Sequence, residues 1–293
     1  MKVPSDEEAP GPAPAAADPT RVRMTVAYDG TRFAGFAENR DVRTVGGELK
    51  AALATVLRHP VNLIVAGRTD AGVHAWGNVV SFDVERPEAE VDVAGLQRHL
   101  NSMLGPAVVV RSAEVAPAGF NARRWAVARR YRYTVLNRSV PDPFLASTTW
   151  QVPEPLDLGA LRLACDPLIG EHDFSSFCRV PKRIPDASLV RHVYDARWLD
   201  LGDGQLRFDI DASSFCQQMV RAIVGTMVPM GAGRQRAGEM AGILRARDRS
   251  AANRVAPARG LCLWEVVYPD DGAAMPRPPV GGRGPRPRES PTA

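Results

Sequence analysis

Residue types and spacing suit catalysis best in one loop, residues 67–74, which reads GRTDAGVH. Its two glycines allow a sharp turn, so Asp70 would be presented from a tight loop at the end of a strand. Arg68 stands two residues away, and a nearby guanidinium favours the ionised carboxylate, leaving Asp70 available as a nucleophile or base at neutral pH. A short Asp-x-Gly turn more often has a purely structural role, with Asp70 capping the turn and Arg68 as its surface partner.

The first half of the chain contains a pattern of elements that would position this loop. Apolar residues alternate over residues 22–28, which predicts a half-buried strand. Further strands are predicted over residues 61–65 and 80–84 and from residue 108. Thr44 and Asp92 can each cap a helix whose apolar residues recur every three or four positions. The predicted order is β-α-β-β-α-β, with the GRTDAGVH loop between the second and third strands.

A similar order is predicted in the second half. Residues 130–135 alternate as a strand, and a hairpin of residues 189–200 and 205–211 turns at Gly202-Asp203-Gly204. A helical stripe is predicted through Leu158, Leu161, Cys165 and Leu168. A long helix is predicted from Ser213 or Ser214, with Phe215, Met219, Ile223 and Met230 on its buried side, and a short one follows through Met240 and Leu244. Residues 261–268 form the last predicted strand.

Two such units in tandem predict an α+β fold made of two ferredoxin-like halves, whose antiparallel sheets are each covered by helices on one face. We expect residues 21–115 to form the N-terminal half and residues 116–271 the C-terminal half. The proline-rich residues 1–20 and 272–293 lack apolar periodicity and are expected to be disordered tails.

Charge and cysteine usage narrow the possible classes of protein. The net charge of +4 is small, but residues 115–141 contain six arginines and no acidic residue, with aromatic residues interleaved, which suits RNA binding. The four cysteines lack C-x-x-C spacing and are expected to be reduced core thiols of a cytosolic protein. The five histidines are dispersed, so no metal site is expected.

Several strings resemble one known family in order and spacing. Besides GRTDAGVH they are YDGT (28–31), FNAR (120–123), ARRYRY (128–133), DFSSF (173–177), MVRAIVG (219–225) and APARGL (256–261). Over roughly residues 21–270, this pattern is similar to that of the bacterial tRNA pseudouridine synthases of the TruA family. The resemblance implies a cytoplasmic homodimeric isomerase that converts uridine to pseudouridine in the tRNA anticodon stem-loop, at tRNA positions 38–40, without metal or cofactor.

The resemblance also implies roles for individual residues. By matching motif, Asp70 would be the catalytic nucleophile, Arg68 would help to orient the flipped nucleotide, and Arg221 would pair with Asp70. Tyr131 would lie against the target uracil, with Leu261 packed on it. Asp70 and Arg68 come from the first half and the other three from the second, so the site is expected in a central RNA-binding cleft between the halves.

Some alternatives stay open at the level of sequence. The chain departs from the family pattern at residues 33–38, Gly46 and Gln218, which bears on RNA contacts. A non-catalytic RNA-binding or tRNA-folding protein could use the same scaffold, and a hydrolase could use Asp70 with His74. We favour a structural role for His74. The sequence does not distinguish attack of Asp70 on C1′, attack on the base, and removal of the 2′ proton to form a glycal.

Overall fold

The computed structural model describes residues 18–180 and 187–269. Both tails predicted to be disordered, apart from residues 18–20, lie outside these ranges, as do residues 270 and 271 of the predicted C-terminal half. The first half contains six helices and strands within the described residues, in the predicted β-α-β-β-α-β order. They are β1 (Thr20–Tyr28), α1 (Val45–Leu57), β2 (Ile64–Val65), β3 (His74–Val84), α2 (Val93–Leu104) and β4 (Val108–Val115).

The helix caps expected in the first half are confirmed. The Thr44 hydroxyl accepts a hydrogen bond from the Gly47 amide at 3.2 Å, and an Asp92 carboxylate oxygen accepts one from the Gly95 amide at 2.7 Å. Each cap satisfies an amide that has no partner within its helix, which fixes where α1 and α2 begin. The strand predicted over residues 61–65 is shorter than expected, because only Ile64 and Val65 pair with β3.

The second half repeats the order with additions. Its elements are β5 (Ala128–Leu136), β6 (Trp150–Gln151), α3 (Leu158–Leu163), β7 (Gly170–Asp173), β8 (Val190–Asp200), β9 (Gln205–Ala212), α4 (Met219–Gly231), α5 (Glu239–Ala246) and β10 (Leu261–Val267). The hairpin at residues 202–204 is confirmed, since β8 and β9 pair antiparallel across it.

Two predicted helices of this half are wrong in extent. The stripe from Leu158 to Leu168 does not form one helix, because α3 ends at Leu163 and a separate 3₁₀ turn containing Pro167 follows it. Helix α4 begins at Met219 rather than at residue 213 or 214, because Gln218 adopts a left-handed conformation with φ of 68°. Phe215 is therefore a loop residue and not part of the buried helix face.

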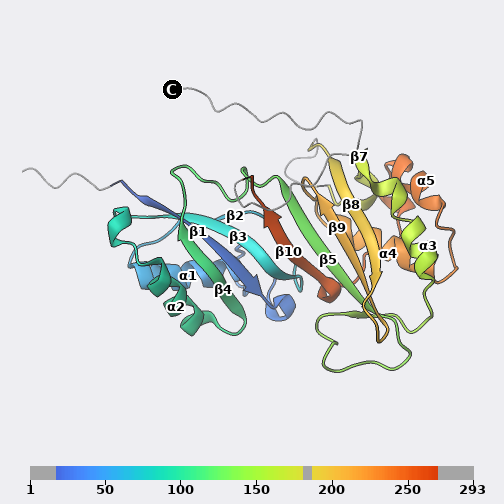
Figure 1. The fold of residues 1–293 in the computed structure, drawn as a ribbon, viewed down its shortest axis with the longest axis horizontal. Helices are drawn as coiled ribbons and strands as arrows, with labels where there is room; N and C mark the ends of the chain where they lie inside the picture. Colours follow the sequence, from blue (N-terminus) through green and yellow to red (C-terminus); the bar gives the residue numbers. More distant parts are fainter. Residues whose placement is uncertain (1–17, 181–186, 270–293) are drawn as a thin grey trace, which may run out of the picture.

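Both halves contribute to a single ten-stranded sheet (Figure 1). The strand order is β4-β1-β3-β10-β5-β9-β8-β7, with β2 also paired to β3 and β6 to β5. The last strand, β10, joins the halves, because it runs parallel to β3 and antiparallel to β5. The α+β architecture of two ferredoxin-like halves is thus confirmed, and their sheets are continuous through β10.

The helices leave one face of the sheet uncovered. In Figure 1, α1 and α4 lie behind the strands of the first and second halves, and no helix crosses in front of them. Strand β1 illustrates the resulting alternation, since Val22, Met24 and Val26 are fully buried while Arg21 and Arg23 are on the opposite face. Within residues 18–180 and 187–269, no helix is long and apolar enough to cross a membrane.

The cysteines correct one sequence-based expectation. Cys165 is buried with a free thiol, as expected. Cys178 and Cys216 are instead joined by a disulfide, with their Cα atoms 5.7 Å apart. The two segments meet because the Arg179 amide donates to the Gln217 carbonyl at 3.0 Å. A separation of 38 residues gave no signal of this pairing in the sequence.

The close packing of α4 generates a stability prediction. A Cβ added at Gly225 would lie 1.8 Å from the Arg254 carbonyl oxygen, so α4 would have to move away from residues 254–256. We expect Gly225→Ala to lower the free energy of unfolding by about 3 kcal/mol. Gly242→Ala is the matched control: Gly242 lies in α5 with nothing within 4 Å of an added Cβ, so stability should rise by up to about 1 kcal/mol. Urea unfolding of both variants tests this, and equal effects would contradict it.

Candidate active site

A cleft of about 860 Å³ opens where the two halves meet. It arises because β2 and β10 share one edge of β3: β2 pairs with Val80 and Ser81, and β10 with His74 and Ala75. The sheet forks between these two pairings, and the GRTDAGVH loop occupies the fork. The cleft is lined by all five residues singled out from the sequence, namely Arg68, Asp70, Tyr131, Arg221 and Leu261.

The conformation of the loop is fixed by a turn and by a buried partner. The Val73 amide donates to the Asp70 carbonyl at 3.1 Å, and Gly72 has φ of +76°, which favours glycine in such a turn. One residue earlier, the Thr69 hydroxyl lies 2.8 Å from the Tyr28 hydroxyl. Burial raises the pKa of Tyr28, so it is a neutral phenol in this contact. Asp70 is thus held from both sides.

The start of the loop is held by Asn78, which is fully buried on β3. Its amide nitrogen donates to the Gly67 carbonyl at 2.8 Å and to the Tyr28 hydroxyl at 3.2 Å. Its carbonyl oxygen accepts from the Gly67 amide at 3.3 Å. A Cβ at Gly67 would lie 3.0 Å from Leu263, so the glycine permits close approach to β10. These bonds fix the loop to the sheet.

Asp70 faces Arg221 across the cleft. A guanidinium nitrogen of Arg221 lies 3.4 Å from an Asp70 carboxylate oxygen, and both side chains are partly buried. The Arg221 Nε atom donates to the Ala256 carbonyl at 2.8 Å, which orients the guanidinium toward Asp70. Among the described residues, Arg221 is the cation paired with Asp70. Arg68 is exposed in the cleft and makes no ion pair with Asp70 there, so proximity in sequence did not identify the partner.

The other wall of the cleft is apolar. The Tyr131 ring is buried and meets the Phe215 ring edge to face, with the ring centroids 4.9 Å apart. Burial raises the pKa of Tyr131, and the negative charge of Asp70 adds to this effect, while the nearby Arg129 opposes it. Tyr131 is therefore neutral at physiological pH. Leu261, at the start of β10, is also buried and lines the same cleft. A planar base entering here would meet a ring and an aliphatic side chain.

Arg129 connects the segments that form the cleft. This buried side chain donates hydrogen bonds to four backbone carbonyls, those of Ala66, Arg123, Ala126 and Ser213. Ala66 precedes the Asp70 loop, residues 123–126 lead into β5, and Ser213 begins the loop before α4. Burial lowers the pKa of Arg129, but a guanidinium remains protonated, so its charge is compensated by these carbonyl dipoles.

The arginines of β5, which suggested RNA binding in the sequence, each have a partner within the protein. Arg129 is buried, as described above. Arg130 forms ion pairs with Asp211 and Glu265. Arg132 stacks on the Trp264 ring at 3.6 Å. Neighbouring strands supply these partners, which local sequence could not reveal. The exposed arginines of the segment include Arg123, which lines the cleft.

His74 has structural contacts, in agreement with the role favoured from the sequence. Its Nδ1 atom lies 3.1 Å from the Gly30 amide nitrogen and 3.1 Å from an Asp29 carboxylate oxygen. Its Nε2 atom lies 3.0 Å from the Ser147 carbonyl and 3.1 Å from the Arg259 carbonyl, so Nε2 carries the proton. The buried ring thus connects the first half to two segments of the second, and it does not line the cleft that contains Asp70.

Sequence reasoning missed two residues that shape the site, Arg129 and Phe215. The period-2 alternation of β5 could have identified Arg129, because positions 129, 131 and 133 share one face and both tyrosines on that face are buried. Nothing in the sequence indicated that Phe215 leaves the helix pattern to contact Tyr131. That contact depends on the left-handed conformation of Gln218.

Comparisons with known proteins show the family to which the chain belongs. A family model described as tRNA pseudouridine synthase matches residues 24–123 and 164–269. A protein named tRNA pseudouridine synthase A from Leifsonia xyli subsp. xyli is 42% identical over 270 residues, which cover 86% of this chain and 93% of the relative. Proteins of the same name from Brevibacillus brevis and Bacillus subtilis are 40% and 38% identical, each covering 85% of this chain and 99% of the relative.

The hydrogen bonds of Arg129 generate a second prediction. Replacing it with methionine keeps much of the aliphatic volume but leaves four carbonyls without their donor. We expect Arg129→Met to lower the free energy of unfolding by about 3 kcal/mol or more. Arg124→Met is the matched control, because Arg124 is exposed and should change stability by less than about 0.5 kcal/mol. Chemical denaturation followed by circular dichroism measures both, and a stable Arg129→Met variant would contradict the structural role.

Proposed function

Because the chain belongs to the tRNA pseudouridine synthase family, an isomerase family, we propose that it converts uridine to pseudouridine in the anticodon stem-loop of tRNA, at tRNA positions 38–40. In this proposal Asp70 is the catalytic residue. One observation carries the assignment: the Asp70 carboxylate faces Arg221 at 3.4 Å inside a cleft whose other wall is formed by Tyr131 and Leu261.

The proposed reaction rearranges bonds within one nucleotide. The bond from N1 of uracil to C1′ of ribose breaks, the base turns, and a bond forms between C5 and C1′. The proton on C5 is lost and N1 gains one, so the reaction has no net redox change and adds no group. A carboxylate can serve as nucleophile toward C1′ or the base, or as base toward the 2′ proton, and Asp70 can fill any of these roles.

The surroundings of Asp70 suit such a reaction. Arg221 holds the carboxylate in place without covering the cleft. Tyr131 and Leu261 provide an apolar surface on which a base extruded from its stem can pack, which offsets part of the few kcal/mol that extrusion costs. They also exclude water from a half-cleaved nucleoside. We assign to the exposed Arg68 and Arg123 the contacts to phosphate and ribose.

We further propose that the protein works in the cytoplasm as a homodimer. The loop of residues 137–149 supports the proposal of a dimer. It is held by an ion pair between Arg138 and Asp142 and by the contact of Ser147 with His74. It nevertheless exposes Val140 by 70% and Phe144 by 92%. An ordered loop that presents large apolar side chains is typical of a surface covered by a partner.

A substitution of the carboxylate tests the catalytic proposal. Asp70→Asn keeps the size of the side chain but removes the charge, so pseudouridine formation should fall by about 10³-fold or more. The Kd for tRNA should change by no more than about threefold, because the phosphate contacts remain. Chemical mapping of pseudouridine in an unmodified tRNA transcript, with filter binding in parallel, measures both quantities.

The control for this experiment is Asp203→Asn. Asp203 is exposed in the hairpin between β8 and β9 with φ of 48°, a conformation that asparagine also tolerates, so activity should be unchanged. If the wild type forms no pseudouridine, or forms it only outside the anticodon stem-loop, the proposed function is wrong. An active Asp70→Asn variant would overturn the role of Asp70 alone.

The dimer proposal makes a separate prediction. The wild type should elute with twice the mass of one chain in size-exclusion chromatography with light scattering, at micromolar concentration. Phe144→Ser should weaken the dimer by at least tenfold, because it removes an apolar contact of the covered loop. Leu163→Ser, at an exposed leucine on α3, should leave the dimer intact. A monomeric wild type would contradict dimerisation, and a Phe144→Ser variant that dimerises normally would place the interface elsewhere.

A further inference from the structure

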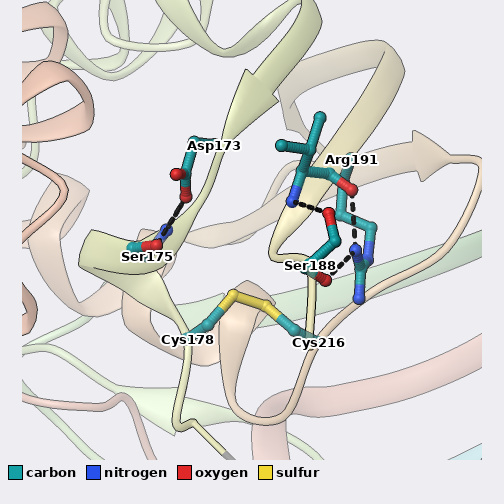
Figure 2. The surroundings of a disulfide bond; sticks show 7 residues. Asp173, Ser175, Cys178, Ser188, Arg191 and Cys216 are labelled. Carbon is teal, nitrogen blue, oxygen red and sulfur yellow. Dashed lines mark hydrogen bonds between the residues drawn. A yellow bond between two sulfur atoms is a disulfide. The ribbon is translucent and has the colours of Figure 1, made fainter. Parts of the chain in front are cut away.

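We propose that Cys178 and Cys216 form a reversible thiol–disulfide site that tethers the α4 side of the cleft to the core of the second half. Figure 2 shows the two side chains pointing toward each other from neighbouring segments. Cys178 follows the 3₁₀ turn Ser175–Phe177, and Cys216 lies in the loop between β9 and α4. The inference goes beyond the proposed isomerisation, which does not require either cysteine.

The backbone places the two cysteines for reversible bonding. Their Cα atoms are 5.7 Å apart, within the range that disulfides span. The hydrogen bond from the Arg179 amide to the Gln217 carbonyl holds the segments side by side independently of the sulfur atoms. A thiol pair would therefore stay adjacent after reduction and could re-form the bond.

The two sulfur atoms differ in access. Cys178 is 1% exposed, whereas Cys216 is half-buried and lines the cleft. A small oxidant entering the cleft would thus meet Cys216 first. Arg191 and Arg221 line the same cleft as Cys216. Burial raises the pKa values of the two remaining cysteines, Cys165 and Cys262, to about 12, so neither competes as a nucleophile.

The exchange is balanced with a low-molecular-weight disulfide such as oxidised glutathione. The Cys216 thiolate attacks one glutathione sulfur, forms a mixed disulfide and releases one glutathione thiolate. The Cys178 thiolate then attacks the Cys216 sulfur and releases the second. The protein dithiol gives up two electrons and two protons, and the oxidant becomes two thiols. Excess reduced glutathione reverses both steps.

The bond bears on the cleft through the loop that contains Cys216. The next residue toward β9 is Phe215, whose ring contacts Tyr131, and five residues after Cys216 stands Arg221, the partner of Asp70. With the disulfide formed, this loop is anchored to the segment after the 3₁₀ turn at residues 175–177. With the disulfide reduced, the hydrogen bond from the Arg179 amide to the Gln217 carbonyl still links the two segments, but the covalent tether is lost. The redox state of the pair thus adjusts how firmly one wall of the cleft is held.

Peptide mapping and thermal melting of the protein, both without RNA, test whether Cys178 and Cys216 form a reversible disulfide. The full chain is equilibrated in mixtures of reduced and oxidised glutathione, free thiols are trapped by alkylation, and tryptic peptides are quantified. The linked Cys178–Cys216 peptide should rise with oxidised glutathione and disappear in excess reduced glutathione. The oxidised protein should melt about 5 °C or more above the reduced protein. Alkylation of both cysteines under all conditions, or only a mixed disulfide on Cys216, would overturn the proposal.

Variants separate the tether from a general effect of thiol oxidation. Cys216→Ser and Cys178→Ala should each abolish the dependence of melting temperature on redox state, and Cys165→Ala should retain it. Two variants are used because Cys178 is deeply buried and its replacement alone could destabilise the fold. A redox response that persists in Cys216→Ser would contradict the assignment.

The effect on the cleft wall rests on the proposed function and has its own readout. The KM for tRNA should be about threefold lower with the pair oxidised than with it reduced, while kcat changes less, because the tether acts on the wall and not on the reacting bonds. An equal KM in both states would overturn the link to the cleft while the peptide map still reports on the site. Absence of any pseudouridine would count against the proposed function instead.

Discussion

A buried positive charge constrains the architecture of the candidate site. The Arg129 guanidinium donates to four backbone carbonyls that belong to three separate segments. A buried cation without such acceptors would be strongly destabilising, so the segments must converge wherever Arg129 points. They are the approach to the Asp70 loop, the linker into β5 and the approach to α4. The same interaction that compensates one charge therefore sets the distance between the two walls of the cleft.

The second constraint is the shared edge of β3. Because β1 occupies its other edge, β2 and β10 must divide the remaining one, and neither can extend past the other. The chain between β2 and β3 is forced out of the sheet at the fork, and it is this stretch that presents Asp70. The sheet thus unites the two halves through β10 and opens the cleft at the same place. The Asp70 carboxylate from one half and an apolar wall from the other meet there without a separate domain interface.

Much of this arrangement could be predicted from the sequence, because it depends on local patterns. Alternation and helix caps gave the order of elements, and Thr44 and Asp92 begin their helices where expected. The motifs of the resemblance selected five residues, and all five line the cleft. Failures occurred where a distant partner decides the outcome. The disulfide joins cysteines 38 residues apart, so no local pattern predicted it. The pairing of Asp70 with Arg221, 151 residues away, was expected from the resemblance, and the structure has it. The extent of α4 was mispredicted because one left-handed residue, Gln218, overrides an apolar periodicity.

The arginines of β5 show why charge counted along a sequence differs from charge presented to a ligand. A strand sends alternate side chains to opposite faces, so a basic run is divided before it meets any partner. Arg130 and Arg132 go to the helix-free face, where the acidic residues of β9 and β10 and the Trp264 ring engage them. Arg129 lies on the buried face, where it donates hydrogen bonds to backbone carbonyls. The other arginines that line the cleft are Arg68 and Arg123 in loops, Arg191 in β8 and Arg221 in α4. In this fold the strand supplies the framework of the cleft, and arginines from loops and from neighbouring elements supply the positive charge inside it.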